Sequence, residues 1–376
     1  MKKYCYLIIL LLFFTLFVSC SDRTTQKTEY ELIKSDSLIN IHIGKSVDPV
    51  TNNLDYYTEN GMEYLIYAHM NDLHLFDLKS REKIEMVRYQ QYGPDGIGNL
   101  NGFYIHNLDS IFLFNHFGMI LTNSKGKVLK RIKLHDHIDE NILIAINPNN
   151  SHIYNRTINQ NNRLLIPTYS IEFKPEIVET LPMGLIYELE DDSITLSKNL
   201  YPKKKGHEYG SSRVVNDSFI VYSFLDNHSL FVYNQNNPHK EYYCKSKYAP
   251  RTFTDLGVGS DLRESVMISI EMQKYSSLLY DPYKKLYYRI FYPGYEVDKN
   301  QTLEYYWIMK DNLKVFSVMI INEQFEAIGE TLMPEDHYNP DTYFINKDGL
   351  HFSLHVNHPE FDADYLKFVN FKIEKK

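Results

Sequence analysis

The sequence predicts an all-β fold, arranged as a six-bladed β-propeller with a short inserted helix. Residues that favour strands are abundant, with 32 Tyr and 21 Phe among 376 residues. Gly (16) and Pro (14) are too scarce for a fibrous or low-complexity chain. A polar turn followed by an apolar strand recurs along the sequence, and repeats of this size in a chain of strands are typical of propeller blades.

The segment 92–115 shows the unit that recurs. After a glycine-rich loop, strands are expected at residues 103–106 and 111–114, joined by a polar turn at residues 107–110. The Asp and Ser side chains of this turn can bond neighbouring backbone groups, which favours a chain reversal. The other copies lie at residues 71–76, 190–196, 216–222, 311–316 and 346–352.

These copies divide the chain into six expected blades. The blades are placed at residues 62–89, 103–134, 163–200, 212–245, 276–332 and 342–374. An early strand at residues 37–43 is expected to complete the last blade, because an isolated strand would leave an exposed sheet edge.

One segment departs from the strand pattern and predicts a helix at about residues 262–272. Asp261 and Glu264 have the spacing of a capping box. Leu262, Val266 and Ile270 then recur at helical spacing. The apolar stripe is expected to pack against the domain, and the alternative is a face for a partner.

Residues 1–19 have the features of a signal peptide. Two lysines precede an apolar run of about a dozen residues, which is short for a membrane span. Cys20 follows a small residue, so we expect cleavage before it, lipid attachment to its thiol, a flexible tether at residues 20–29 and a propeller domain at residues 30–376. The alternatives are an uncleaved anchor or an ordinary secretory signal with a chance cysteine.

Charge and cysteine content exclude some partners. The net charge of −8 is unsuited to nucleic acid, which requires clustered Lys and Arg. Because Cys5 leaves with the signal and Cys20 carries lipid, Cys244 is left without a disulfide partner. We expect it to be a packed thiol. The glycine-rich loop at residues 93–98 is followed by a strand, not the helix that a phosphate site needs.

The polar loop at residues 200–215 most resembles a ligand site. His207 and Arg213 are expected at the mouth of the central channel, and Arg251 and Arg289 are candidates to join them, because guanidinium groups bind carboxylates in a bidentate manner. The alternative for each is a surface salt bridge. No catalytic residue, cofactor or metal site is predicted.

Two histidine patterns could supply metal ligands. His135 and His137 flank Asp136 in a segment read as extended, where they could form half of a zinc site. His351 and His355 alternate with apolar residues, so they could line the channel if their strand is the innermost one. A solvated turn and a wet channel wall are the preferred interpretations.

The lipoprotein-like start, GPDGIGNLNGF at residues 93–103 and LLYDPYKKLYYRIFY at residues 278–292 together resemble the DUF4221-type, propeller-like lipoproteins of Bacteroidetes. The resemblance implies an envelope-anchored protein, at the outer membrane, with no catalytic residues to transfer. We therefore expect a monomeric, non-enzymatic binding or scaffold protein for a glycan, peptide or protein. The alternative is a hydrolase or lyase acting at the channel mouth.

Overall fold

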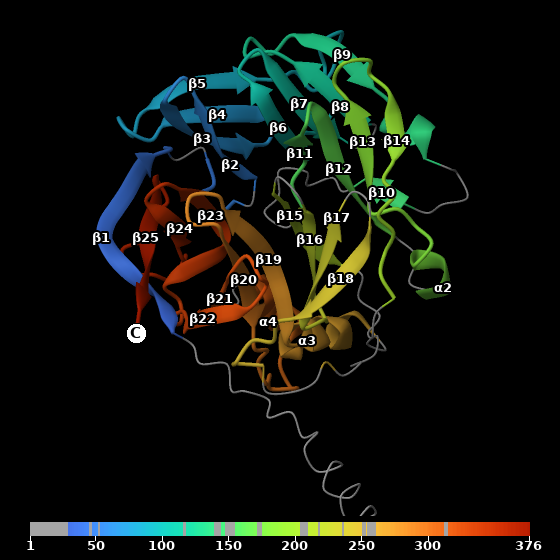
Figure 1. The fold of residues 1–376 in the computed structure, drawn as a ribbon. Helices are drawn as coiled ribbons and strands as arrows, with labels where there is room; N and C mark the ends of the chain where they lie inside the picture. Colours follow the sequence, from blue (N-terminus) through green and yellow to red (C-terminus); the bar gives the residue numbers. More distant parts are fainter. Residues whose placement is uncertain are drawn as a thin grey trace, which may run out of the picture.

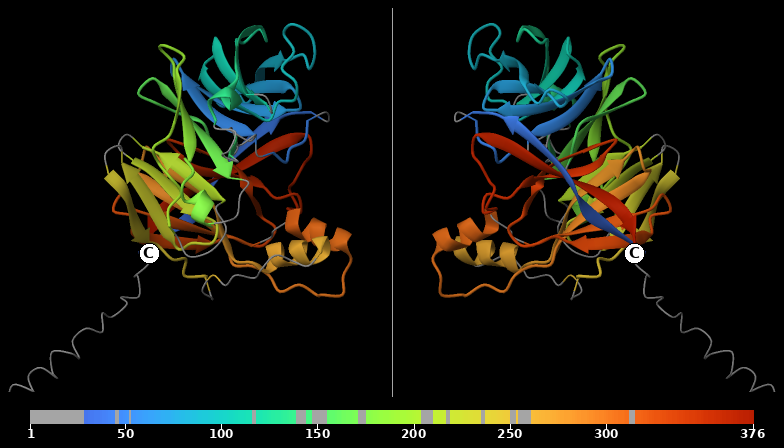
Figure 2. Two further views of the ribbon diagram at one scale, coloured as in Figure 1. Left: turned by 90° about the vertical axis from the view of Figure 1, so that its right-hand side faces the viewer. Right: turned by 90° about the vertical axis from the view of Figure 1, so that its left-hand side faces the viewer.

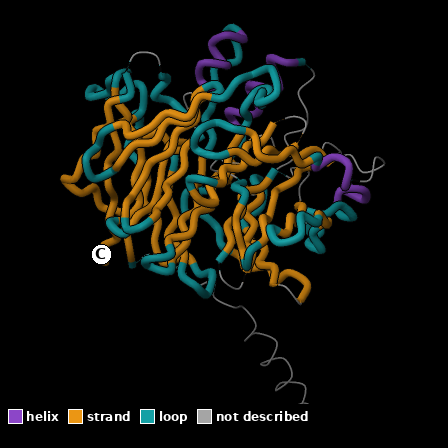
Figure 3. The backbone as a smooth tube through the Cα atoms, turned by 90° about the horizontal axis from the view of Figure 1, so that it is seen from above, coloured by secondary structure: helices purple, strands orange, loops and turns teal. Residues whose placement is uncertain are grey.

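The computed structural model describes residues 29–376 apart from gaps at residues 45–46, 52, 116–117, 139–143, 147–154, 171–174, 204–209, 217–218, 235–236, 250–252, 254–260 and 312–314. The predicted all-β class is confirmed. Figure 3 shows that strands make up most of the chain and that helices lie at the margin of the molecule. In Figure 1 the sheets follow one another in chain order around a common centre.

Four sheets each take one stretch of the chain. The first contains β2 (Leu54–Glu59), β3 (Met62–His69), β4 (Asp72–Asp77) and β5 (Lys83–Arg88). The second contains β6 (Gly102–Asn107), β7 (Ser110–Asn115), β8 (Gly118–Thr122) and β9 (Val128–Ile132). The third contains β10 (Ile144–Ile146), β12 (Arg163–Ser170), β13 (Gly184–Glu188) and β14 (Ile194–Leu196), with β11 (Ile158–Gln160) paired to β12. The fourth contains β15 (Ser211–Val215), β16 (Phe219–Phe224), β17 (Ser229–Asn234) and β18 (Asn237–Tyr243).

The fifth sheet has eight strands and unites both ends of the chain. One half contains β19 (Lys274–Asp281), β20 (Leu286–Tyr292), β21 (Ser317–Ile321) and β22 (Ala327–Leu332). The other contains β1 (Tyr30–His42), β25 (Tyr365–Lys375), β24 (Gly349–Leu354) and β23 (Tyr338–Asn346). The halves meet where Tyr30 of β1 pairs in parallel with Gly329 of β22. The number of blades stays a prediction, because two four-stranded units share this sheet.

The early strand closes the fold as expected. β1 lies antiparallel to β25, from the pair Tyr30 and Lys375 to the pair His42 and Tyr365. The N-terminal strand of the described chain therefore hydrogen-bonds the C-terminal one. This pairing protects the edges of both strands and confirms the predicted role.

Several of the polar turns form where the sequence places them, but the copy expected at residues 311–316 does not, because Asp311 ends a helix and the next strand begins at Ser317. The backbone N–H of Asp109 donates to Asn107 Oδ1 at 2.9 Å, and that of Asp348 donates to Asn346 Oδ1 at 2.9 Å. In these two turns the Asn at the start supplies the acceptor, whereas in the copy at residues 190–196 the backbone N–H of Ser193 donates to Asp191 Oδ1 at 3.0 Å. Such Asx turns reverse the chain without a strained backbone.

Neighbouring sheets pack face to face through apolar side chains. Leu75 of the first sheet and Ile105 of the second share one buried cluster. Phe112 of the second sheet and Leu164 of the third share another. Every residue of β24 is buried, so both of its faces are covered. This continuous packing holds the first strand of each unit in a fixed position around the centre.

The predicted helix is confirmed as α3 (Leu262–Glu271). Asp261 caps it, because its Oδ1 accepts the backbone N–H of Glu264 at 2.8 Å. A second helix, α4 (Leu303–Asp311), interrupts the expected fifth blade and was not predicted. Tyr306 of α4 packs into the same buried cluster as Val266 of α3.

The remaining helical turns are short, namely α2 (Pro175–Val178) and the 3₁₀ turn η1 (Leu134–His137). Figure 2 shows α3 and α4 projecting together on the side away from the C-terminus. Within the described parts of the chain, no helix combines the length and apolar character needed to cross a bilayer.

Candidate functional site

A cavity of about 660 Å³ is the best-formed candidate site within the described chain. Its walls come from β2, β11, β15, β19 and β23. These strands surround the centre of the molecule in Figure 1. Because each strand belongs to a different unit, the cavity is assembled from segments far apart in the sequence.

One wall of the cavity carries amide side chains. Asn159, Gln160 and Asn161 lie along β11 and the turn that follows it. Asn159 Nδ2 lies 3.3 Å from His106 Nδ1, and Gln160 Nε2 donates to the backbone oxygen of Asn216 at 3.2 Å. These contacts hold the amide nitrogens of both side chains, and their oxygens remain as possible acceptors.

The facing wall is aromatic and apolar. The rings of Tyr56 and Phe344 stack with centroids 5.8 Å apart. Tyr280 and Tyr343 contribute further rings, and Leu279 adds aliphatic surface. A cavity with one amide wall and one aromatic wall is suited to a compact polar ligand, which would stack on the rings and hydrogen-bond the amides.

An ion pair lies at the edge of this cavity. The Arg156 guanidinium contacts the Asp55 carboxylate through Nη1 and donates through Nη2 to the backbone oxygen of Leu54 at 3.2 Å. Burial raises the pKa of Asp55, and the positive charge of Arg156 opposes that rise. Sequence patterns missed this pair, because its two members lie 101 residues apart.

Of the predicted site residues that the structure describes, Arg213 lies at the cavity. Its side chain is 4% exposed and extends from β15 toward the third sheet. Nη2 donates to the backbone oxygens of Leu165 at 2.6 Å and of Arg156 at 3.3 Å. A ligand contact through Arg213 stays a prediction.

Arg289 lies away from the cavity, between the fourth and fifth sheets. It is fully buried, and its guanidinium carbon lies 3.4 Å from the centroid of the Tyr275 ring. Nε donates to Ser223 Oγ at 2.8 Å. The other donors reach the backbone oxygens of Phe224, Asn227, His228 and Cys244. All five N–H groups therefore have protein acceptors, which favours a structural role over the expected ligand contact.

The structure describes only some of the remaining residues singled out from the sequence. His207, Arg251 and the lipid-attachment residue Cys20 lie outside the described residues. Cys244 is free and 1% exposed, which confirms a packed thiol. Burial raises its pKa to about 12, although the charge of Arg289 opposes this rise.

Neither histidine pattern has the local structure that a metal site predicted from the sequence would need. His135 and His137 lie in the η1 turn rather than in an extended segment. His351 lies in β24, which is paired on both sides and is not an innermost strand. The ring of His351 stacks on Phe344 with centroids 4.4 Å apart, and burial lowers its pKa to about 4. The described residues contain no group of three or more His, Cys, Asp or Glu placed to hold a metal.

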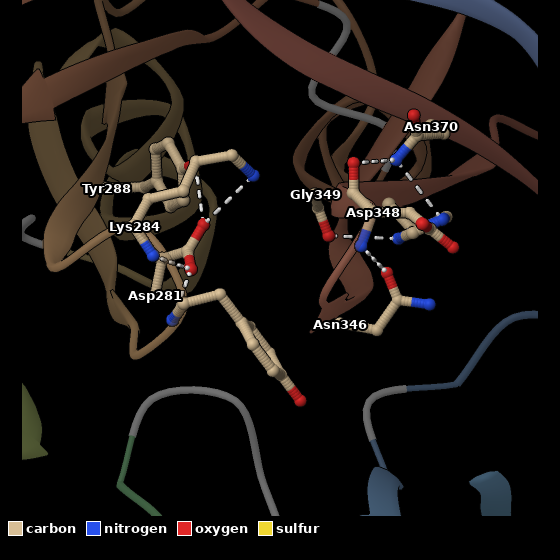
Figure 4. Close-up of polar contacts among 9 residues, drawn as sticks. Asp281, Lys284, Tyr288, Asn346, Asp348, Gly349 and Asn370 are labelled. Atoms are coloured by element: carbon tan, nitrogen blue, oxygen red, sulfur yellow. Dashed lines mark hydrogen bonds and ion pairs between the residues drawn. The ribbon is translucent and has the colours of Figure 1, made fainter.

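Two hairpin turns beside the cavity are fixed by internal hydrogen bonds, as Figure 4 shows. In the β19–β20 turn, Asp281 Oδ1 accepts the backbone N–H of Lys284 at 3.0 Å, and Asp281 Oδ2 accepts the hydroxyl of Tyr288 at 3.1 Å. In the β23–β24 turn, Asn370 Nδ2 donates to the backbone oxygen of Asp348 at 3.2 Å. These bonds hold the strands that form the aromatic wall.

The sequence itself identifies the family. Residues 29–332 match DUF4221, a domain of unknown function. The chain belongs to the DUF4221 family. The resemblance seen in the sequence motifs is thereby confirmed for this DUF4221 chain, and no curated protein matches it.

Solved structures share the fold of this DUF4221 protein. A member of the DUF4221 family from Bacteroides vulgatus ATCC 8482 is 22% identical, with a TM-score of 0.82 over 93% of this chain and 100% of its own. A protein of Bacteroides fragilis NCTC 9343 described as exported is 9% identical, with a TM-score of 0.53 over 95% of this chain and 98% of its own. At these identities the likeness concerns the fold alone.

Proposed function

We propose that this DUF4221 protein is a non-enzymatic binding or scaffold protein of the cell envelope, which holds a glycan, peptide or protein segment in the central cavity. The observation that carries this proposal is the pairing of an amide wall with an aromatic wall in one cavity. It acts as a monomer and binds no nucleic acid, in keeping with its net charge of −8.

The binding walls belong to a six-bladed propeller. In this proposal the eight-stranded sheet counts as two blades, one made of β19–β22 and the other of β23–β25 with β1. Each half is antiparallel within itself, and the link between them is a single parallel pair. Such a ring is a rigid support, so little ordering of the protein opposes ligand binding.

The protein is held at the outer membrane through lipid on Cys20, after removal of residues 1–19. The lysines and apolar run before Cys20 support this location, and so does the exported Bacteroides fragilis protein of similar fold. Replacement Cys20→Ala should move the protein from the membrane to the soluble fraction and abolish metabolic labelling with a fatty acid. Unchanged membrane association would contradict the anchor.

Binding is tested with the mature chain carrying Cys20→Ser, screened against immobilised glycans and peptides. Val215 is half-buried and lines the cavity, so Val215→Trp should fill it and abolish binding. Leu129→Trp adds the same side chain at a residue that is 49% exposed, and it should leave binding unchanged. The proposal fails if no probe binds or if Val215→Trp binds normally. Turnover of a bound probe would instead support the hydrolase or lyase alternative.

A further inference from the structure

The charged side chains that line the cavity are all of one sign. Arg156 and Arg213 both contribute to its surface, and no carboxylate is among the described lining residues. A charge taken from water loses hydration, which costs free energy unless a partner compensates it. The positive charge of the lining therefore indicates the charge of the ligand that the cavity would bind.

The Arg156 guanidinium does not use all of its N–H donors within the described chain. Two of its contacts are made by Nη1 to Asp55 and by Nη2 to Leu54, while a guanidinium has five N–H groups. Its side chain is 29% exposed, and the Asp55 side chain is 21% exposed. The pair is neutral as a whole, yet the remaining N–H groups of Arg156 have no acceptor among the described residues. These groups suit a planar anion, which can accept two parallel hydrogen bonds.

Arg213 supplies positive charge that no described acid neutralises. It is 4% exposed, its hydrogen-bond acceptors within the described chain are backbone oxygens, and its Nε has no hydrogen-bond partner there. Because Nη2 of Arg213 donates to the backbone oxygen of Arg156, the two residues are in direct contact. The cavity lining thus carries about one positive charge in excess, in a site shielded from water where its field is strong.

The other lining groups match a sugar ring. The Tyr56 hydroxyl is buried close to Tyr283 and Glu63. The amides of Asn159 and Gln160 make their hydrogen bonds to His106 and Asn216 through nitrogen, so these bonds do not use the amide oxygens. The half-buried ring of Tyr56, backed by the buried Phe344 ring, gives an apolar surface against which C–H groups can pack. A volume of about 660 Å³ accommodates one or two sugar units.

We infer that the cavity recognises an acidic sugar unit through a single carboxylate, that is, a uronic acid. This inference rests on the proposed binding function and narrows its ligand class. The carboxylate takes the free N–H groups of Arg156 and balances the charge of Arg213, while the sugar ring packs on Tyr56. A phosphate ester carries more negative charge than the lining can balance, and a neutral sugar leaves the excess unbalanced.

The experiment compares matched acids and amides on the mature chain carrying Cys20→Ser. Dissociation constants of glucuronate and galacturonate oligosaccharides are measured by calorimetry beside those of the corresponding uronamides. Loss of the carboxylate should weaken binding about tenfold or more, because a charge-assisted bidentate contact is replaced by a neutral one. The double variant Asp55→Asn/Arg156→Gln should lose most of the preference for acid over amide, since it removes the bidentate donor without leaving Asp55 unpaired and leaves only the charge of Arg213.

Arg88→Gln is the matched control, because this side chain is 71% exposed and lies on β5, outside the cavity. It should keep the wild-type preference for acids. Equal binding of acids and amides by the wild type would overturn the uronic acid assignment and leave the proposed binding function standing. Tighter binding of sugar phosphates, or of peptides only through a free C-terminal carboxylate, would also overturn it. Failure of every probe would remove the binding function itself.

Discussion

His74 is a buried histidine whose environment should make the stability of the fold depend on pH. It lies on β4, is 4% exposed, and neither ring nitrogen has a partner within the described chain. Its ring packs near those of Tyr67 and Phe76, at centroid distances of 6.1 and 6.4 Å. Burial lowers the pKa of His74 from 6.5 to about 4. Lys83 adds to this effect and Asp72 opposes it.

The magnitude follows from proton linkage. Because the folded-state pKa lies below the unfolded value, the unfolded chain binds more protons between about pH 6.5 and pH 4, and stability falls as the pH drops through this range. For pKa values of 6.5 and about 4, His74 destabilises the fold by about 2 kcal/mol at pH 5 relative to pH 7. His228 and His351 also have pKa values of about 4, so they add to the acid sensitivity.

His74→Phe tests this reasoning, because it keeps a flat ring and removes the titrating group. Urea denaturation at pH 7 and pH 5 should show that the variant loses about 2 kcal/mol less on acidification than the wild type. At pH 7 it should be at least as stable, because two unpaired polar atoms leave the core. His137→Phe, at an exposed position, is the control for replacing a histidine by phenylalanine outside the core. Equal acid sensitivity of His74→Phe and wild type would refute the assignment.

Two further substitutions test the scaffold by denaturant unfolding. Arg289→Met should lower the free energy of unfolding by about 3–5 kcal/mol, because several buried acceptors lose their donors. Arg88→Met, at an exposed site, is the control and should change it little. A decrease below about 1 kcal/mol for Arg289→Met would contradict its structural role. Gly349 has φ +134°, and an added Cβ would lie 2.4 Å from the backbone oxygen of Phe371, so Gly349→Ala should lose about 2 kcal/mol or more. At Gly61 an added Cβ meets no atom within 4 Å, so Gly61→Ala should lower the free energy of unfolding less than Gly349→Ala does. Equal decreases in the two variants would show that backbone conformation alone sets the effect.

Features with a local cause could be predicted from the sequence. The strand expected at residues 103–106 is β6, and the helix beginning after Asp261 is α3. In both cases the pattern that reveals the element, a run of apolar residues beside a turn or cap, is also what stabilises it. The closing role of β1 followed from a physical rule that applies to any sheet edge.

Features without a local cause were missed. α4 lies within an aromatic sequence that favours strands, and its capping signal is a single residue, Thr302, whose Oγ1 accepts the backbone N–H of Tyr305 at 3.2 Å. The pairing of Asp55 with Arg156 depends on how the first and third sheets meet, which no nearby residue encodes. The alternation of apolar and polar residues predicts burial along a single strand, whereas the cavity forms where strands of several sheets meet.

Arg289 and Arg156 show how donor satisfaction separates a structural residue from a candidate site residue of the same type. The aromatic residues on both sides of Arg289 in β20 already indicated a buried strand, and there a guanidinium must find five acceptors within the protein or lose stability. Arg289 finds all five, so a ligand at that position would have to displace bonds that hold two sheets together. Arg156 uses two donors and borders the cavity, so a carboxylate can bind it without breaking the described contacts. The incomplete hydrogen bonding of Arg156, more than its charge, is therefore what makes Arg156 the candidate contact for a ligand in the proposed site.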